Sequence, residues 1–382
     1  MLRQTIIFLF SVILISCGQN TGRKKNATAD PKSETGGASM YTQIKGLLAG
    51  QPVTMNLIRT TATDFTGWYS YDKVGEPIQF WGQTDSTGHV VLTEERVDGS
   101  QNPYFKGNLG DNGVYEGKWY DEEKGISMDF KLEPNTDPKL IHFDVIYRTD
   151  SAKLIPARPN SPVGNVVTTV LWPRGGTDEA VLQKLRSAIT RPDTEKDFPD
   201  GEAFAKYLTE QFKTGYTAGM DKKELDDILG SEGAAMAFNY VEDTRMSIPW
   251  NQWPLLVVEK FLYSYTGGAH GNHASGFIVF DLENGKVLKP EDVFLPGYKP
   301  IVGKALEKAF RKKYGIGENE SLKDNLLFEE HVEPNGNFYL TDKGVVFSYS
   351  PYEIAPFAAG QISAFIPFEE IRSVMQPTYL PK

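Results

Sequence analysis

Apolar and polar residues alternate in a series of short runs near the start of the chain. Turn residues such as Asp98-Gly99 and Asp111-Asn112-Gly113 separate one run from the next. This alternation is typical of half-buried strands, and short strands joined by closely spaced turns are typical of an antiparallel barrel or sandwich. The pattern predicts an all-β meander over residues 40–135. Its expected strands cover residues 51–58, 67–72, 77–82, 89–95, 104–109, 113–120 and 125–132.

The tryptophans of this segment allow two interpretations. Trp68, Trp81 and Trp119 could line a barrel that holds a small apolar ligand. A unit of about 95 residues also needs bulky side chains to fill its interior, so we favour a packed core. Gly67 and Gly117 stand shortly before a tryptophan, and we expect them to let an indole pack across the neighbouring strand.

After residue 138 the alternation gives way to a mixture of two periodicities. Apolar residues recur at helical spacing in some stretches and at strand spacing in others. Predicted helices cover residues 178–190, 202–219, 222–230, 299–314 and 322–330. Predicted strands cover residues 139–147, 166–172, 231–250, 254–265 and 276–282.

The end of the chain completes a mixed pattern. Residues 337–375 predict two strands, a proline-bounded loop, a further strand and a helical turn. The three prolines of residues 155–163 indicate an extended connector or a crossover. We therefore predict an α+β fold, in which an N-terminal all-β meander barrel or sandwich precedes a mixed α+β domain. That second domain covers residues 138–382 and is expected to have an antiparallel sheet with packed helices.

The first residues predict a secretory signal. Arg3 precedes an apolar run over residues 6–15, which is shorter than the roughly 20 residues that a membrane-spanning helix needs. The residues Leu14-Ile15-Ser16-Cys17 resemble the lipobox of bacterial lipoproteins. That resemblance implies a signal peptide over residues 1–16 and a diacylglycerol on the sulfur of Cys17, which would anchor the protein in a lipid bilayer. The alternative is a plain signal peptide with an incidental cysteine, and Cys17 is the only cysteine of the chain.

The lipidated cysteine is followed by a segment with the composition of a flexible tether. Residues 18–39 are rich in Gly, Ser and Thr and carry four basic and two acidic residues. The whole chain has a net charge of −10, so the folded part is strongly acidic. We expect no binding to nucleic acid and an attraction to basic partners. No acidic run follows Cys17, which favours a bacterial envelope protein on the periplasmic side of the outer membrane.

Several ordered motifs carry a resemblance to the PdaC/RsiV-like domain superfamily. The first is Tyr265-Thr266-Gly267-Gly268-Ala269-His270-Gly271-Asn272. The match extends over roughly residues 160–375 and leaves out the all-β segment. The resemblance implies an extracytoplasmic α+β recognition domain, which binds lysozyme in one member and accompanies a peptidoglycan deacetylase domain in another. The further motifs are residues 281–285, 288–294, 337–341, 344–349, 352–356 and Gly360.

The loop over residues 263–273 is the best candidate for a binding site. His270 and His273 are three positions apart, a spacing that turns two side chains to opposite faces of an extended chain. No His-Glu-x-x-His and no Gly-x-Ser-x-Gly motif occurs, so we predict no metal, no cofactor and no catalytic serine. We expect the loop glycines to adopt positive φ, and His270 and Asn272 to bond nearby backbone. The candidate ligand contacts are Tyr265, Thr266, His270, Asn272, Tyr349, Tyr352 and Glu353.

Two classes of function remain at this point. The first is a non-catalytic binding module of the envelope, whose partner is a muramidase such as lysozyme or the glycan of peptidoglycan. The second is a hydrolase that modifies an envelope polymer with the loops over residues 263–273 and 349–357. The tyrosine-rich second loop serves either as a packing element or as a surface on which sugars stack.

Overall fold

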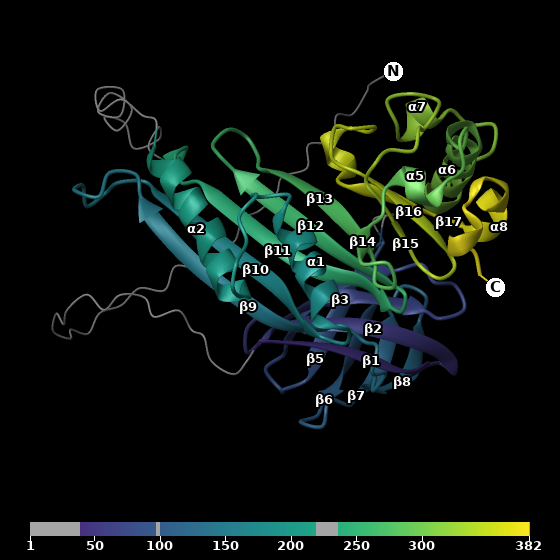
Figure 1. The fold of residues 1–382 in the computed structure, drawn as a ribbon, viewed down its shortest axis with the longest axis horizontal. Helices are drawn as coiled ribbons and strands as arrows, with labels where there is room; N and C mark the ends of the chain where they lie inside the picture. Colours follow the sequence, from purple (N-terminus) through teal and green to yellow (C-terminus); the bar gives the residue numbers. More distant parts are fainter. Residues whose placement is uncertain (1–38, 97–99, 219–235, 382) are drawn as a thin grey trace, which may run out of the picture. The chain divides into compact units, whose positions relative to one another are not determined.

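The computed structural model describes residues 39–96, 100–218 and 236–381, and Figure 1 shows how their helices and strands are arranged. Three of the predictions lie outside these residues: the signal peptide, Cys17 with almost all of the tether, and the helix over residues 222–230. In the described part of the chain, no helix is both long and apolar enough to span a lipid bilayer.

The all-β segment forms a closed barrel of eight strands, so the barrel alternative of the predicted meander is confirmed. Each strand pairs antiparallel with the next, and the last pairs with the first. The strands are β1 (Met40–Leu48), β2 (Gln51–Arg59), β3 (Asp64–Tyr71), β4 (Ile78–Thr84), β5 (Val90–Glu94), β6 (Tyr104–Leu109), β7 (Tyr115–Asp121) and β8 (Ile126–Pro134).

The first of these strands escaped the sequence prediction. β1 carries the polar Gln43 and the small Gly46 among its positions, which interrupts the apolar alternation. Gln43 is nevertheless buried, and a Cβ on Gly46 would lie 1.9 Å from the carbonyl oxygen of Lys131. Both residues therefore suit a strand that closes a barrel against β8.

The barrel interior is packed with side chains. Tyr69, Phe80, Phe105, Tyr115 and Phe130 meet there with buried aliphatic residues from β1, β2, β5 and β8. Trp119 belongs to this core, which confirms the preferred interpretation for that ring. Trp81 is 44% exposed and lies outside it.

The small residues beside the tryptophans have a different role from the one expected. Gly117 lies opposite Gly107 on β6, and a Cβ on Gly117 would lie 2.2 Å from the carbonyl oxygen of Lys106. A Cβ on Gly67 would lie 2.0 Å from the carbonyl oxygen of Asn56. The expectation that these glycines make room for an indole is wrong, because neighbouring backbone fills the space and the strands approach closely.

A six-stranded sheet follows the barrel in the order β14-β13-β12-β11-β10-β9. All neighbours are antiparallel except β10 and β11, which are parallel. The predicted antiparallel sheet is confirmed for four of the five strand pairs, and the parallel pair makes it a mixed sheet. The strands are β9 (His142–Lys153), β10 (Val163–Gly175), β11 (Val241–Gln252), β12 (Leu255–Tyr265), β13 (Asn272–Asp281) and β14 (Lys286–Val287).

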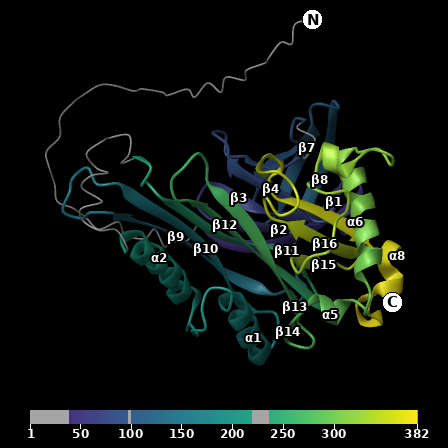
Figure 2. The ribbon, with the colours of Figure 1, turned by 90° about the horizontal axis from the view of Figure 1, so that it is seen from above.

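The parallel pair exists because two helices carry the chain between its strands. α1 (Glu179–Thr190) begins after Asp178, and α2 (Gly201–Thr217) begins after Asp200. Both aspartates accept a hydrogen bond from the first turn of their helix, which stabilises its free N–H groups. The helices lie along one face of the sheet (Figure 2) and share an apolar core with it. The prolines after β9 lie in the connection between antiparallel β9 and β10, so they form a connector.

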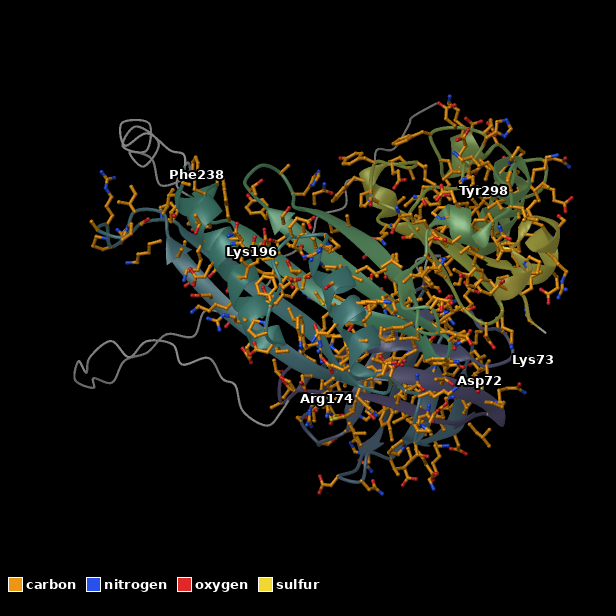
Figure 3. All side chains as sticks on the ribbon, in the orientation of Figure 1. Asp72, Lys73, Arg174, Lys196, Phe238 and Tyr298 are labelled. Atoms are coloured by element: carbon orange, nitrogen blue, oxygen red, sulfur yellow. The ribbon has the colours of Figure 1, made fainter. Side chains whose placement is uncertain are left out.

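The C-terminal part is a three-stranded antiparallel sheet with helices around it. The helix predicted over residues 322–330 ends at Asn325, because the Glu330 carboxylate turns back to accept the backbone N–H of Leu322. Tyr298, labelled in Figure 3, stacks on Phe294 with ring centroids 4.5 Å apart. The elements are α5 (Pro290–Val293), α6 (Lys299–Tyr314), α7 (Leu322–Asn325), β15 (Phe338–Leu340), β16 (Gly344–Tyr349), β17 (Ile362–Pro367) and α8 (Phe368–Ile371).

Four polar side chains join the barrel to the six-stranded sheet, and we call them the polar seam: Tyr41, Gln43, Asn56 and Asn251. Gln43 donates to the side-chain oxygen of Asn56 and to the backbone oxygen of Asn251, both at 2.9 Å. Asn251 donates to the Tyr41 hydroxyl at 2.8 Å, and that hydroxyl donates to Asn56 at 2.9 Å. The seam thus connects residues about 200 positions apart through mutual hydrogen bonds.

The close approach of β6 and β7 predicts the effect of a side chain at Gly117. Gly117→Val should lower the free energy of unfolding by about 2–4 kcal/mol, because the new atoms overlap backbone that cannot move aside cheaply. Gly276→Val is the matched control: it lies in β13, and no atom lies within 4 Å of its Cβ position. Urea unfolding of both variants measures the difference, and equal losses would contradict the steric explanation.

Candidate functional site

The two loops that the sequence singled out meet in the structure. The His270 ring, at the tip of the β12–β13 hairpin, stacks on Phe357 with centroids 4.1 Å apart. His273 meets the same phenylalanine edge-on at 6.0 Å, and Tyr352 lies 5.5 Å from it. Phe357 was not among the predicted contacts, yet it connects the two loops.

The hairpin tip is a turn fixed by its own hydrogen bonds. Gly267 and Gly268 have φ values of 93° and 92°, which confirms the expected positive φ. The predicted bonds to backbone are confirmed as well: the His270 ring bonds the Gly271 carbonyl at 2.8 Å, and the Asn272 side chain accepts the backbone N–H of His273. The Tyr265 hydroxyl donates to the Gly268 carbonyl at 3.1 Å, and Thr266 is exposed.

The second loop divides into a buried and an exposed part. Tyr349 is buried and donates its hydroxyl to the backbone oxygen of Glu333, so it belongs to the core. Tyr352 has a φ of 69° and is 56% exposed. The Glu353 carboxylate accepts hydrogen bonds from the Ser350 backbone and the Asn335 amide, which holds the loop in shape. Tyr352 is the member of this loop that is open to a partner.

Beside the hairpin lies a cleft of about 560 Å³, which we call the polar cleft. Three parts of the chain contribute to it: β3 and the barrel segments around β4 and β5, the strands β12 and β13, and the C-terminal elements from α6 to β17. His273 and Ser275 line the cleft, so it adjoins the hairpin directly. Its charged lining residues are Glu76, Glu94, Glu95, Arg96, Glu259 and Lys313.

Glu259 lies on the sheet side of the polar cleft and is only 4% exposed. Its two carboxylate oxygens accept the hydroxyls of Ser247 at 2.5 Å and Ser275 at 2.6 Å. The Ser247 hydroxyl in turn accepts the indole N–H of Trp68 from the barrel at 2.7 Å. Burial raises the pKa of Glu259, and the hydroxyl hydrogen bonds oppose that shift in part.

Glu94 lies at the end of β5, on the barrel side of the cleft, and is 7% exposed. Its Oε1 atom accepts the Tyr69 hydroxyl at 2.9 Å and the Trp119 indole N–H at 2.5 Å. Burial raises the pKa of the carboxyl, and these two donors oppose the rise. The aromatic donors therefore hold the carboxyl group in a fixed orientation.

Lys313 of α6 brings a positive charge to the same space. Its ammonium donates to the backbone oxygen of Ser363 at 2.8 Å and to the hydroxyl of that residue at 3.2 Å. Burial lowers the pKa of Lys313, while the charges of Glu76 and Glu95 oppose this. Burial likewise raises the pKa of Glu76, and Lys313 opposes that rise. The cleft thus holds several ionisable groups in partial burial, which is typical of ligand and catalytic sites.

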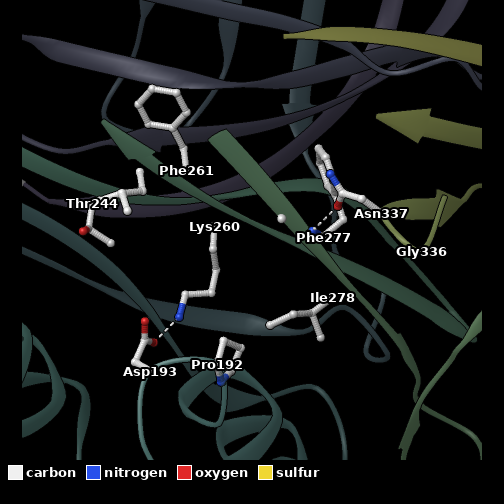
Figure 4. Close-up of a pocket in the computed structure, with 11 residues that line it drawn as sticks. Pro192, Asp193, Thr244, Lys260, Phe261, Phe277, Ile278, Gly336 and Asn337 are labelled. Carbon is white, nitrogen blue, oxygen red and sulfur yellow. Dashed lines mark hydrogen bonds and ion pairs between the residues drawn. The ribbon is translucent and has the colours of Figure 1, made fainter. Parts of the chain in front are cut away.

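A second pocket of about 360 Å³ lies on the helix-covered face of the sheet, and Figure 4 shows its lining. Leu262, Ile278 and Pro192 make it largely apolar. The Lys260 ammonium is paired with Asp193 at one side, so its charge is already neutralised. The pocket offers few groups that would orient a polar ligand, and the polar cleft is the stronger candidate.

Asn337 closes the outer edge of β13 next to this second pocket (Figure 4). Its side-chain oxygen accepts the backbone N–H of Phe277 at 3.1 Å, and its amide donates to the carbonyl of Ser275 at 2.8 Å. The amide therefore bonds β13 as a residue of a neighbouring strand would.

The residues that line the polar cleft were missed at the level of sequence, although a weak signal exists. Glu94 shares its strand face with the apolar Val90 and Leu92, and Glu259 shares its face with Val257. A carboxylate on the buried face of a strand is rare unless it is paired or functional. Among the described residues, no group of three or more His, Cys, Asp or Glu is placed to hold a metal ion.

Comparison with known proteins identifies part of the chain. Residues 291–369 match the family model described as DUF3298, a protein of unknown function, so they form a DUF3298 domain. A comparison with curated proteins gives no match.

Two crystal structures of DUF3298 family proteins are similar to this chain. One comes from Bacteroides fragilis, is 24% identical with a TM-score of 0.57, and the match covers 64% of this chain and 98% of that chain. The other comes from Pseudomonas aeruginosa PAO1 and is 18% identical with a TM-score of 0.43, covering 63% and 97%. The similarity to the structure from Bacteroides fragilis supports the fold described above for this chain.

The burial of Glu259 predicts a pH dependence of stability. Its carboxyl has a higher pKa in the folded than in the unfolded chain, so the folded state binds the proton more tightly. The free energy of unfolding should therefore fall as the pH rises from about 4.5 to the raised value. Glu259→Gln should remove this fall and gain stability relative to the wild type across that window.

Urea unfolding at a series of pH values measures this effect. Glu116→Gln, on the exposed side of β7, is the control for the loss of one negative charge. A stability difference between Glu259→Gln and the wild type that stays constant, or shrinks as the pH rises, would contradict the explanation.

Proposed function

We propose that the protein is a lipid-anchored binding module of the bacterial envelope, which holds a segment of glycan in the polar cleft. The observation that carries this proposal is the cleft itself, where the barrel, the sheet and the C-terminal part each place polar side chains around one space. A volume of about 560 Å³ lies within the range of ligand sites in proteins, roughly 300–1,000 Å³.

The lining suits a sugar better than an apolar ligand. The carboxylates and the amide of Gln361 can bond hydroxyl groups, while Phe261, Phe277 and Tyr314 offer ring faces to the apolar side of a pyranose. These three rings are partly exposed, which leaves them open to contact. Glycan strands of peptidoglycan fit this mixture of polar and apolar contacts.

The loops beside the cleft provide a second surface for recognition. Tyr352 is exposed and packs on Phe357, which in turn stacks on His270. A glycan that leaves the cleft would meet these rings. The resemblance to the PdaC/RsiV-like superfamily supports a muramidase as a further partner, and the net charge of −10 would attract such a basic protein.

A hydrolase remains the second candidate, because two buried carboxyl groups with raised pKa values line one cleft. A carboxyl with a raised pKa can serve as a general acid. Glu94 would be that acid, since only one of its oxygens is occupied by hydrogen bonds. Release of new reducing ends from peptidoglycan, lost in Glu94→Gln, would favour this candidate over simple binding.

Blocking the cleft tests the binding proposal. Gln79 of β4 is exposed and lines the cleft, so Gln79→Trp should fill its entrance and reduce binding of soluble peptidoglycan fragments at least about tenfold. Glu116→Trp, on the outside of the barrel, is the matched control and should bind as the wild type does. Isothermal titration measures both, and equal binding by the two variants would refute the cleft as the glycan site.

The lipid anchor is tested separately. Cys17→Ser removes the sulfur that would carry the diacylglycerol, so the protein should lose palmitate labelling and move from the detergent phase to the aqueous phase. We expect the wild type to remain with outer membranes, on their periplasmic side. A Cys17→Ser protein that still partitions with detergent would contradict anchoring at this cysteine.

A further inference from the structure

The polar cleft has more negative than positive groups in its lining. Four carboxylates lie around it, against Lys313 and Arg96. Arg96 forms an ion pair with Asp121 of the barrel and a second one with Glu123 at 3.5 Å. These ion pairs engage groups outside the cleft lining, while the charge of Arg96 also lowers the pKa of Glu94. Lys313 is the second cation of the cleft.

The position of Lys313 decides which carboxylates it neutralises. The charges of Glu76 and Glu95 raise its pKa against the effect of burial. In the part of the chain that the structure describes, no carboxylate lies within 4.0 Å of its ammonium, which bonds Ser363 instead. The charge of Lys313 thus acts on Glu76 and Glu95 through space. Glu94 is subject to the charge of Arg96 instead, and Glu259 is held by serine hydroxyls.

These two remaining carboxylates differ in how many of their oxygens are occupied. Both oxygens of Glu259 accept a serine hydroxyl. Glu94 accepts its two hydrogen bonds on Oε1 alone, and Oε2 has no donor among the described residues. Glu94 is more than nine-tenths buried and lines the cleft, so its second oxygen is left for whatever enters the cleft. This oxygen is accessible at the surface of the cleft, so a ligand can donate a hydrogen bond to it.

We infer that the polar cleft selects a ligand that carries an ammonium group and that Glu94 Oε2 accepts its N–H. This inference rests on the proposed function and names the chemistry that the site prefers. An ammonium donor forms a charge-assisted hydrogen bond, which is shorter and stronger than a bond to a neutral donor. Two sources on an envelope glycan have this chemistry: an unacetylated amino sugar and the side-chain amine of an attached peptide.

Protonation of Glu94 gives the interaction a pH dependence. The groups that face this carboxyl are Tyr69 from β3, Trp119 and Asp121 from β7, and Arg96 after β5, with Tyr71 farther along β3. Burial raises the pKa of Glu94 above its usual 4.5. Binding of an ammonium ligand should therefore weaken as the pH falls through that raised value, because the protonated carboxyl has lost its charge.

Matched pairs of ligands test the inference on the full-length protein by isothermal titration at about pH 7. One pair is a glucosamine oligosaccharide and its N-acetylated form, and the other is a stem peptide with a free side-chain amine and its acetylated form. In at least one pair the amine should bind about tenfold or more tightly than its acetylated partner. The pair that shows the difference identifies the source of the ammonium group.

Three variants assign the preference to Glu94. Glu94→Gln keeps an acceptor for Tyr69 and Trp119 but removes the charge, and the preference should fall to about twofold or less. Glu95→Gln, at the exposed neighbour, should reduce it by no more than about threefold. Lys313→Met should tighten binding of the amine, because it removes a competing cation without touching the hydrogen bonds of Glu94.

The outcomes separate this inference from the proposed function. Equal binding of the amine and acetylated forms in both pairs would overturn the ammonium preference and leave the glycan site intact. No binding by any of the four ligands would refute the proposed function and this inference with it. If Glu95→Gln lost as much of the preference for the amine as Glu94→Gln does, the preference would be a general effect of negative charge. This result would refute the role of Oε2. If Glu94→Gln unfolds, weaker or unchanged amine binding by Lys313→Met decides against the inference.

Discussion

The geometry of the whole site depends on the polar seam between the barrel and the six-stranded sheet. Tyr41, Gln43, Asn56 and Asn251 are buried or nearly so. Asn56 is bonded within the barrel, whereas the bonds of Gln43 and Tyr41 with Asn251 form only when the two sheets meet in one orientation. A small slip would leave several polar groups buried without partners, which costs far more than the same slip between apolar surfaces. Because Glu94 belongs to the barrel and Glu259 to the sheet, this orientation also determines the shape of the cleft between them.

The two buried glutamates show how the same residue type can serve different purposes. Glu259 is satisfied at both oxygens and, through Ser247 and Trp68, adds a second connection between barrel and sheet. Glu94 is held at one oxygen only, by aromatic donors that cannot rotate away without disturbing the barrel core. The first arrangement stabilises the joint, whereas the second keeps an acceptor prepared for an incoming group. Both glutamates are buried, so burial does not distinguish the structural role of Glu259 from the binding role of Glu94. The difference is whether both carboxylate oxygens accept a hydrogen bond or only one does.

Local patterns predicted most elements but little of the cleft. The barrel strands and α6 follow from uninterrupted periodicity, and the hairpin turn follows from its glycines. β1 was missed because buried Gln43 finds its partners on the neighbouring strand β2 and on Asn251 of the sheet, which no local pattern reveals. The parallel pairing of β10 with β11 depends on the path of the intervening helices. The cleft joins residues from three distant segments, so its carboxylates gave only the weak signal of a charge on a buried strand face.

The amide of Asn337 has a consequence for the boundaries of the folding unit. It replaces a strand neighbour for β13, and the core beneath it mixes residues of the sheet, such as Val257 and Val279, with residues of the C-terminal part. The segment over residues 291–369 that defines the DUF3298 match therefore lacks the part of its apolar core that the sheet supplies. Evolution can recombine a module freely only if it folds alone. We therefore expect the segment over residues 291–369 to be inherited together with the six-stranded sheet. The ligand preferences of the cleft are then inherited with the segment and the sheet.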